Sequence, residues 1–264
     1  MKQFEATILK NRKIAESWRE LVLSWDSRAS RPQPGQFLTL RVSPRYDPLL
    51  RRPFAFSGVA ADASSVSVLY QVRGSATRIL SELALESTID IVGPLGRAFP
   101  KPGTAERSLL AAGGMGLGPI LFLAQAEMAD GTRATLGPNE PLFALGFRDA
   151  ASIPDIELPA GTILCTDDGS AGMRGRPLDY ISLNAARGGA RVYACGPAAM
   201  LAAFAELARE RSWNASLSAE QWMACGVGAC MGCALPRPSG QGFLRACADG
   251  PVFERDEIDW AALA

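Results

Sequence analysis

The first hundred residues consist of short apolar runs separated by proline- and glycine-rich breaks. The runs are rich in β-branched and aromatic residues, which are typical of strands. One stretch of helical pattern, residues 77–85, interrupts them. Strands are predicted at residues 4–8, 19–25, 37–42, 54–59, 66–72 and 88–92. Short strands at this spacing predict an antiparallel β barrel over residues 1–100.

The pattern changes after the segment GPLGRAFPKPG at residues 93–103. Strand-like runs now alternate with helical periods, which predicts a parallel sheet covered by helices on both faces. The strands are predicted at residues 109–112, 142–147, 162–166 and 191–195, and the helices at residues 118–128, 177–186 and 197–211. From residue 212 on, the chain is rich in glycine and cysteine, with little room for a core of its own. We therefore expect three domains, at residues 1–100, 101–212 and 213–264.

Charge and hydropathy exclude several classes of function. The 27 basic residues balance the 27 acidic ones, so no basic excess recommends nucleic acid or an anionic membrane as a partner. Residues 108–126 carry no charge, but the glycines and Pro119 within this run favour a strand, a turn and a helix over a membrane span.

The first ten residues lack the apolar region of a signal peptide, so we expect a cytoplasmic protein. Histidine is absent, so the chemistry must use cofactors or other side chains.

Four of the six cysteines lie within the last 40 residues. Cys225, Cys230, Cys233 and Cys247 form the pattern C-x4-C-x2-C followed by a fourth cysteine after thirteen intervening residues, which is the plant-type spacing of [2Fe–2S] ligands. Interleaved glycines let the backbone wrap tightly and direct amide N–H groups at the sulfurs. A four-thiolate zinc site and free buried cysteines are the alternatives. Zinc sites usually pair two short C-x2–4-C units, whereas here one loop carries three ligands.

Two glycine turns predict a nucleotide site. Gly113, Gly114 and Gly116 follow one predicted strand, and Cys195, Gly196 and Pro197 follow another. Because ligands bind at the carboxyl ends of parallel strands, we expect both turns to meet at a pyrophosphate. The strand at residues 142–147 ends in Arg148 and Asp149. Asp149 suits the ribose of NAD and Arg148 the 2′-phosphate of NADP, so the choice stays open. Cys165, at another strand end, is interpreted as a small buried hydrophobic residue.

A paired arginine and a second strand-to-helix turn lie in the first domain. Arg51 and Arg52 precede a predicted strand, and the segment YQVRGSAT at residues 70–77 leads from a strand into the short helix. An arginine fork and a helix start both suit phosphate recognition.

Taken together, these motifs resemble the ferredoxin–NADP⁺ reductase superfamily, and more narrowly the electron-transfer subunits of class 1B dihydroorotate dehydrogenase. The motifs that carry the resemblance are PGQF at 34–37, LLRRPF at 49–54, VGPLGRAF at 92–99, AAGGMGLGP at 111–119, TDDGSAGMRG at 166–175, YACGPAAM at 193–200, MACGVGACMGC at 223–233 and CADGPVF at 247–253. The resemblance implies FAD on the barrel, NAD on the next domain and a [2Fe–2S] cluster on the four cysteines.

The resemblance also assigns a flavin-binding stretch, which comprises Arg52, Pro53, Phe54, Ala55, Leu69, Tyr70, Gln71, Ala76 and Thr77. Two positions depart from the family, which usually has Ser in place of Ala55 and Gly in place of Ala76. The first change removes a hydroxyl beside the flavin, and the second would be unfavourable if the backbone there had a positive φ.

By the same resemblance, the partner is an FMN-containing dihydroorotate dehydrogenase catalytic subunit in a hetero-oligomer, with electrons passing to NAD⁺. One alternative is the electron-transfer subunit of a different oxidoreductase, such as a sulfide dehydrogenase- or transhydrogenase-like complex. Those relatives tend to replace the first cluster cysteine with Asp, so Cys225 argues against them. The other alternative is a cluster-based redox sensor, which would not need the loop at residues 113–119.

Overall fold

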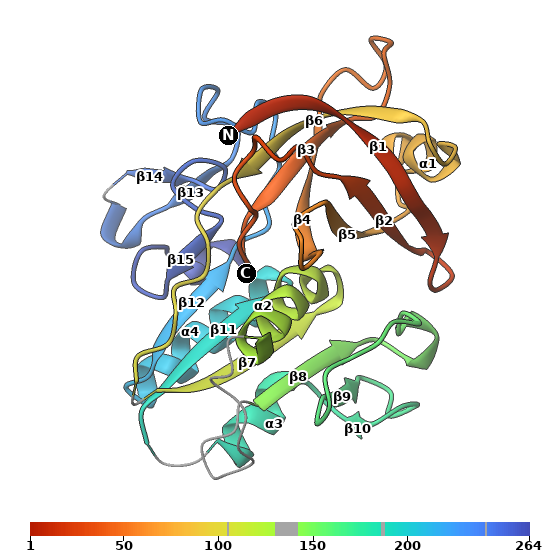
Figure 1. Cartoon of the computed structure of the whole chain (residues 1–264). Helices are drawn as coiled ribbons and strands as arrows, with labels where there is room; N and C mark the ends of the chain where they lie inside the picture. The colour runs from red at the N-terminus through yellow and green to blue at the C-terminus, as the bar shows by residue number, and fades with distance from the viewer. Residues whose placement is uncertain (105, 130–141, 186–187, 241) are drawn as a thin grey trace.

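The N-terminal part of the chain is a closed barrel (Figure 1). The computed structural model describes residues 1–104, 106–129, 142–185, 188–240 and 242–264. Around the barrel the strands follow in the order β1 (Lys2–Lys13), β2 (Trp18–Ser24), β5 (Ser65–Gln71), β4 (Arg52–Val59), β3 (Phe37–Arg41) and β6 (Thr88–Leu95), each antiparallel to its neighbours. The predicted barrel and all of its strands are confirmed.

Alternation along each strand builds the barrel core. Leu21 and Leu23 of β2 and Leu38 and Leu40 of β3 are fully buried, while the residues between them face away from this core. Such a period of two is what a strand with one buried face requires. The helix predicted at residues 77–85 is shifted: α1 spans Ser75–Glu82 and the chain is already extended at Leu83.

The second layer is a seven-stranded sheet below the barrel in Figure 1. Its order is β10 (Met173–Arg174), β9 (Ile163–Thr166), β8 (Leu142–Phe147), β7 (Arg107–Gly113), β11 (Ala190–Cys195), β12 (Asn214–Ser218) and β15 (Val252–Glu254). All neighbouring pairs are parallel except β12 and β15.

Helices cover both faces of this sheet, as predicted. Leu110 and Ala112 of β7 pack with α2 (Leu117–Ala129), whereas Leu109 and Ala111 pack with α3 (Pro177–Asn184) and α4 (Ala198–Glu210). Since α2 lies between the sheet and barrel strand β4, it is apolar on all sides over its first two turns. The charge-free run at residues 108–126 is therefore a strand, a turn and a helix. Among the described residues, no helix is long and apolar enough to span a membrane.

The segment after residue 212 does not have a separate core. Trp213 and Phe253 pack with Phe204 of α4 in the same cluster as the sheet. The strands β12 and β15 join the sheet, and β13 (Ala234–Pro236) pairs with β14 (Phe243–Arg245) as a small hairpin. These strands were not predicted, because runs of three to five residues among glycines and cysteines show no periodicity.

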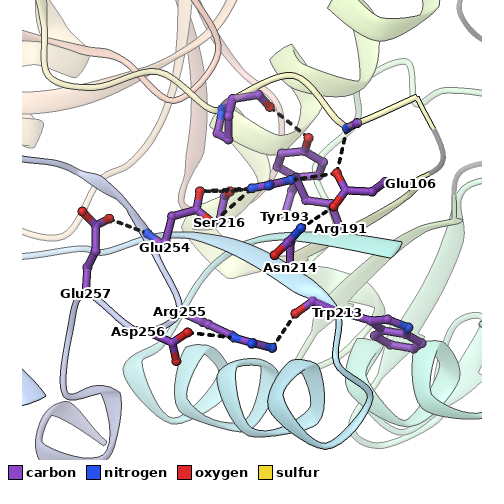
Figure 2. Close-up of polar contacts among 12 residues, drawn as sticks. Glu106, Arg191, Tyr193, Trp213, Asn214, Ser216, Glu254, Arg255, Asp256 and Glu257 are labelled. Carbon is purple, nitrogen blue, oxygen red and sulfur yellow. Dashed lines mark hydrogen bonds and ion pairs between the residues drawn. The ribbon is translucent and has the colours of Figure 1, made fainter. Parts of the chain in front are cut away.

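A polar network holds β15 to the sheet (Figure 2). Arg191 of β11 donates through Nε to Glu106 at 3.1 Å and through Nη1 to both carboxylate oxygens of Glu254 at 3.1 Å. Ser216 of β12 donates to Glu254 at 2.8 Å, and Asn214 donates to Glu106. Glu106, Arg191 and Asn214 lie where their strands begin, so the network is at the sheet edge opposite the predicted nucleotide turns.

Candidate functional site

The four C-terminal cysteines lie together as two pairs of thiols. Cys233 and Cys247 are buried and their sulfurs are 3.2 Å apart. The thiols of Cys225 and Cys230 also contact each other, and Cys230 is exposed. Three of the four cysteines lie in the loop before β13, and Cys247 lies in the turn after β14. The β13–β14 hairpin brings Cys247 back to the other three.

Backbone amides surround the sulfurs. The Val227 N–H donates to the Cys225 sulfur at 3.4 Å, and the Gly228 N–H donates to the Cys247 sulfur at 3.1 Å. The Gly232 N–H donates to the Cys230 sulfur at 3.4 Å, and the Cys247 N–H donates to the Cys233 sulfur at 3.4 Å. The hydrogen bond from Val227 lowers the pKa of the Cys225 thiol to about 6. Burial, followed by the neighbouring Cys233, raises the pKa of Cys247 to about 12. Amide donors of this kind stabilise bound thiolates.

This geometry fits a two-iron cluster better than a single ion. A structural zinc ion needs four ligands that converge on one point. Among the described residues, no three His, Cys, Asp or Glu side chains form a site that could hold one ion. Two separate thiol pairs are what two irons require, because each iron of a [2Fe–2S] core takes two protein ligands. The donor set and its amides therefore suit the predicted cluster.

The cysteine loop lies against the barrel. A Cβ atom on Gly226, whose φ is +72°, would come within 3.0 Å of Cγ2 of Thr39 on β3. Thr39 lies opposite Pro53 of β4 in the sheet register, so the loop is one strand away from the predicted flavin stretch. On the other side, the Arg97 N–H donates to the carbonyl of Gly250, and the Arg97 side chain pairs with Glu257 at 2.9 Å.

The structure separates the predicted flavin residues into two groups. Those with partly exposed side chains are Arg52, Pro53, Phe54 and Ala55 on β4, Gln71 at the end of β5 and Thr77 on α1. The side chains of Leu69, Tyr70 and Ala76 are buried. Tyr70 donates its hydroxyl to Asn11 at 2.9 Å, and burial raises its pKa to about 12. Arg52–Ala55 of β4 are all half-buried, and the ring of Phe54 packs against the barrel core and against Tyr70.

The expected conflict at Ala76 does not arise. Ala76 lies in the first turn of α1 and is not among the residues with positive φ. The condition of a positive φ is not met at residue 76, and the helical backbone there suits any L-residue. Beside it, the amides of Arg73 and Gly74 donate to Thr77 Oγ1 at 3.0 and 3.1 Å, which closes the turn into the helix.

A cavity of about 590 Å³ lies between the barrel and the carboxyl edge of the sheet. Gly113 and Gly114 line it after β7, and Pro197 lines it after β11. The barrel contributes Gln71. The cavity is thus where strand topology places a nucleotide in open parallel sheets.

Both glycine turns meet beside this cavity. A Cβ atom on Gly116 would lie 1.9 Å from the carbonyl oxygen of Cys195, so only glycine allows this approach. A Cβ atom on Gly196 would likewise lie 3.1 Å from the amide nitrogen of Gly113. Burial raises the pKa of Cys195 to about 12, and that of Cys165 to about 11. Cys165 is fully buried in β9, as expected for a small hydrophobic residue.

Other cavity residues were missed from the sequence. Trp18 is the first residue of β2, and Arg176 directly precedes α3. Arg73 lies in the turn before α1, within the segment at residues 70–77 that the sequence had already indicated. A run of charged and polar residues next to a strand end was the only available signal. Asp149 and Arg148, which were noted, both line the cavity. Asp149 accepts from the Ser152 N–H at 2.9 Å and from Arg148 Nε at 2.9 Å.

Known proteins share this arrangement. A family model for the iron-sulfur cluster binding domain of dihydroorotate dehydrogenase B matches residues 220–259. A dihydroorotate dehydrogenase B (NAD(+)) electron transfer subunit from Listeria monocytogenes serotype 4a (strain HCC23) is 37% identical over 268 residues, covering 98% of this chain and 99% of that protein. The subunit of the same name from Geobacillus sp. (strain WCH70) is 34% identical over 263 residues, with coverage of 98% and 99%. The chain belongs to this family of electron transfer subunits.

Membership in this electron transfer subunit family confirms the resemblance and the role predicted from the motifs. A solved structure agrees with it: an NADH-dependent reduced ferredoxin–NADP oxidoreductase, described for flavin-based electron bifurcation, has a TM-score of 0.81 and 28% identity, covering 98% of this chain and 91% of that one. The barrel, the sheet and the cluster segment of this electron transfer subunit are therefore parts of one oxidoreductase module.

Proposed function

We propose that the chain transfers electrons between NAD(H) and a flavoenzyme partner, with FAD and a [2Fe–2S] cluster as its resident cofactors. The observation that carries the proposal is the contact between the cysteine loop and the barrel, since Gly226 lies against β3, the strand beside the predicted flavin stretch. The partner is an FMN-containing dihydroorotate dehydrogenase catalytic subunit, as in the complex after which the related subunits are named.

Each cofactor has its own set of residues in this proposal. Cys225, Cys230, Cys233 and Cys247 hold the irons. The flavin lies along Arg52–Ala55, with Gln71 and Thr77 beside it. The nucleotide fills the cavity lined by Gly113, Gly114 and Pro197, where Gly116, Cys195 and Gly196 shape the wall. When bound, FAD exchanges a hydride with NAD(H) and single electrons with the cluster. The three segments 1–100, 101–212 and 213–264 carry these three tasks.

The partner is proposed to dock over the exposed thiol of Cys230. Around the cysteine loop, Trp222 is 89% exposed and Met231 is 49% exposed, which is unusual for side chains of this size. Trp and Met are enriched in the centres of protein interfaces. None of the six cysteines forms a disulfide, which supports a reducing, cytoplasmic location.

Co-purification tests the partner. The tagged chain, isolated without oxygen from its native cell, should retain an FMN-containing dihydroorotate dehydrogenase, and the complex should reduce NAD⁺ with dihydroorotate. The double variant Trp222→Ser/Met231→Ser should lose the partner while keeping the visible spectrum of cluster and flavin. Recovery of a different oxidoreductase would replace the proposed partner, and a preparation without iron and labile sulfide would refute the cluster.

A second variant separates the cofactors. Cys230→Ser should abolish the [2Fe–2S] spectrum and electron transfer to the partner, while NADH still reduces the flavin. Loss of flavin reduction in a folded variant would contradict the order nucleotide, flavin, cluster. Ser170→Ala, at an exposed turn far from the thiols in sequence, is the control and should change neither spectrum.

The solved oxidoreductase structure described above suggests an alternative partner that can be tested. The 28% identical oxidoreductase is named for ferredoxin and NADP, so a subunit of a transhydrogenase-like complex is the second candidate. The first cluster ligand argues for the proposed family, because it is Cys225 and not an aspartate. The same co-purification experiment distinguishes the two candidate functions, because each predicts that a different partner protein is recovered.

A further inference from the structure

We propose that Arg245 raises the reduction potential of the cluster by placing its positive charge behind the peptide groups that donate to the cysteine sulfurs. This inference rests on the proposed function, because it assumes that the four cysteines hold a [2Fe–2S] cluster. It adds a positioning residue that none of the cysteine motifs contains.

The guanidinium of Arg245 bridges the two parts of the cysteine site. Arg245 ends β14, two residues before Cys247. Its Nη1 donates to the carbonyl of Gly228, in the loop of the first three cysteines, at 2.8 Å. Its Nε and Nη2 donate to the two carboxylate oxygens of Asp249 at 3.0 Å each. A fork of this kind is specific to arginine.

The carbonyl that Arg245 contacts belongs to the peptide between Gly228 and Ala229. The N–H of that same peptide donates to the sulfur of Cys225. The preceding amide, the N–H of Gly228, donates to the sulfur of Cys247 at 3.1 Å. Since hydrogen bonds in a chain polarise one another, the guanidinium strengthens the donor to Cys225 and holds the donor to Cys247 in place. Arg245 therefore acts on one sulfur of each thiol pair.

The direction of the effect follows from charge. Reduction adds one electron to a cluster whose ligands are already negative, so a nearby positive charge stabilises the reduced form more than the oxidised form. Asp249 works against this effect, because its carboxylate carries the opposite charge and accepts both hydrogen bonds of the Arg245 fork. The two members of the pair should thus shift the potential in opposite directions when each is neutralised.

An EPR-monitored redox titration of the anaerobic holoprotein tests this. Arg245→Gln, which keeps a donor and loses the charge, should make the midpoint potential more negative. The expected change in the reduction equilibrium is about tenfold, or about 59 mV for a one-electron couple. Arg245→Lys should remain near the wild-type potential. Asp249→Asn should move the potential in the positive direction.

The opposite signs separate charge from structure. A clamp that is merely structural would loosen the loop in both variants and shift both potentials the same way, and that result would overturn the proposal. Arg28→Gln, which breaks an Arg–Asp pair of similar geometry on the barrel, is the matched control and should leave the potential unchanged. If Arg245→Gln does not retain its cluster, Asp249→Asn still tests the proposal. A midpoint potential of Asp249→Asn equal to or more negative than that of the wild type would overturn it. A wild-type protein without a [2Fe–2S] signal would instead refute the proposed function, and this inference with it.

Discussion

Gly226 of the cysteine loop lies directly against Thr39 of barrel strand β3, with only 3.0 Å between the Thr39 methyl carbon and the position of a Cβ atom on Gly226. Thr39 is 3% exposed, so its side chain has no free space into which it could move. The contact sets how closely the cysteine loop approaches the barrel.

Gly226→Ala should therefore move the loop away from β3. The alanine also carries about 1–2 kcal/mol of strain at its positive φ. We expect lower iron and labile sulfide per chain and slower reduction of the cluster by NADH, measured by chemical analysis and stopped-flow absorbance. Gly240→Ala is the matched control, because Gly240 has a φ of +68° but nothing within 4 Å of its Cβ position. Equal losses in both variants would show that backbone strain, and not the contact with Thr39, is responsible.

The network around Arg191 should contribute to stability in a pH-dependent way. Burial would raise the pKa of Glu106, but hydrogen bonds from the Gly103 N–H, Asn214 and Arg191 outweigh it and hold the pKa below the ordinary 4.5. A lowered folded-state pKa means that the stabilisation is complete above pH 4.5 and is lost as the pH falls through the folded-state value. Urea denaturation of Glu106→Gln should show a deficit at pH 7 that shrinks below pH 4.5. A deficit that is constant with pH would contradict the ionic role.

Removal of the cation should cost more than removal of one carboxylate. Arg191→Met leaves Glu106 and Glu254 near each other without their shared counter-charge, at a cost of about 3 kcal/mol, as for a broken buried ion pair. The same denaturation measurement checks this. Arg176→Met, which breaks an exposed pair with Asp179, should leave the midpoint unchanged. A midpoint for Arg191→Met equal to that of this control would show that the network is not stabilising.

Asp149 should favour NADH over NADPH. Its carboxylate lines the cavity proposed for the nucleotide, and hydrogen bonds from Ser152 and then Arg148 hold its pKa below the ordinary value, so it is charged at neutral pH. A 2′-phosphate would be repelled by this charge. Asp149→Asn should lower the ratio of kcat/KM for NADH over NADPH by about tenfold, or about 1.4 kcal/mol. Asp168→Asn, on the next loop and outside the cavity lining, should leave the ratio unchanged, and an unchanged ratio in both would exclude Asp149 as the selective group.

Ala55→Ser should strengthen flavin retention. Ala55 is half-buried on β4, at the position where the family resemblance implies serine. One hydrogen bond contributes about 0.5–1.5 kcal/mol, so the FAD dissociation constant should fall severalfold. Fluorescence of released FAD measures this. The control Ala61→Ser lies in an exposed turn. If both variants retain FAD as the wild type does, the flavin does not contact residue 55.

The elements with regular periodicity were predictable from the sequence. Leu38 and Leu40 alternate with residues that face away from the barrel core, and the four cysteines have a spacing that few sites share. The barrel and the proposed ligand set therefore follow from local order alone. The short strands β12 and β15 were not predictable, because their register depends on partners far along the chain. Arg176 and Arg245 were missed for the same reason, because an arginine becomes part of a site only through the segments that fold against it.

The sequence by itself therefore determined the fold class, the cofactor set and the four thiols, since each depends on the types and spacing of nearby residues. Only the tertiary structure decided which thiols pair, that Gly226 rests on Thr39, that Ala76 is helical and that Arg245 lies behind the Gly228 peptide. The physical reason is that these relationships join residues from different segments, and their distances are set by packing of the barrel, the sheet and the hairpin on one another.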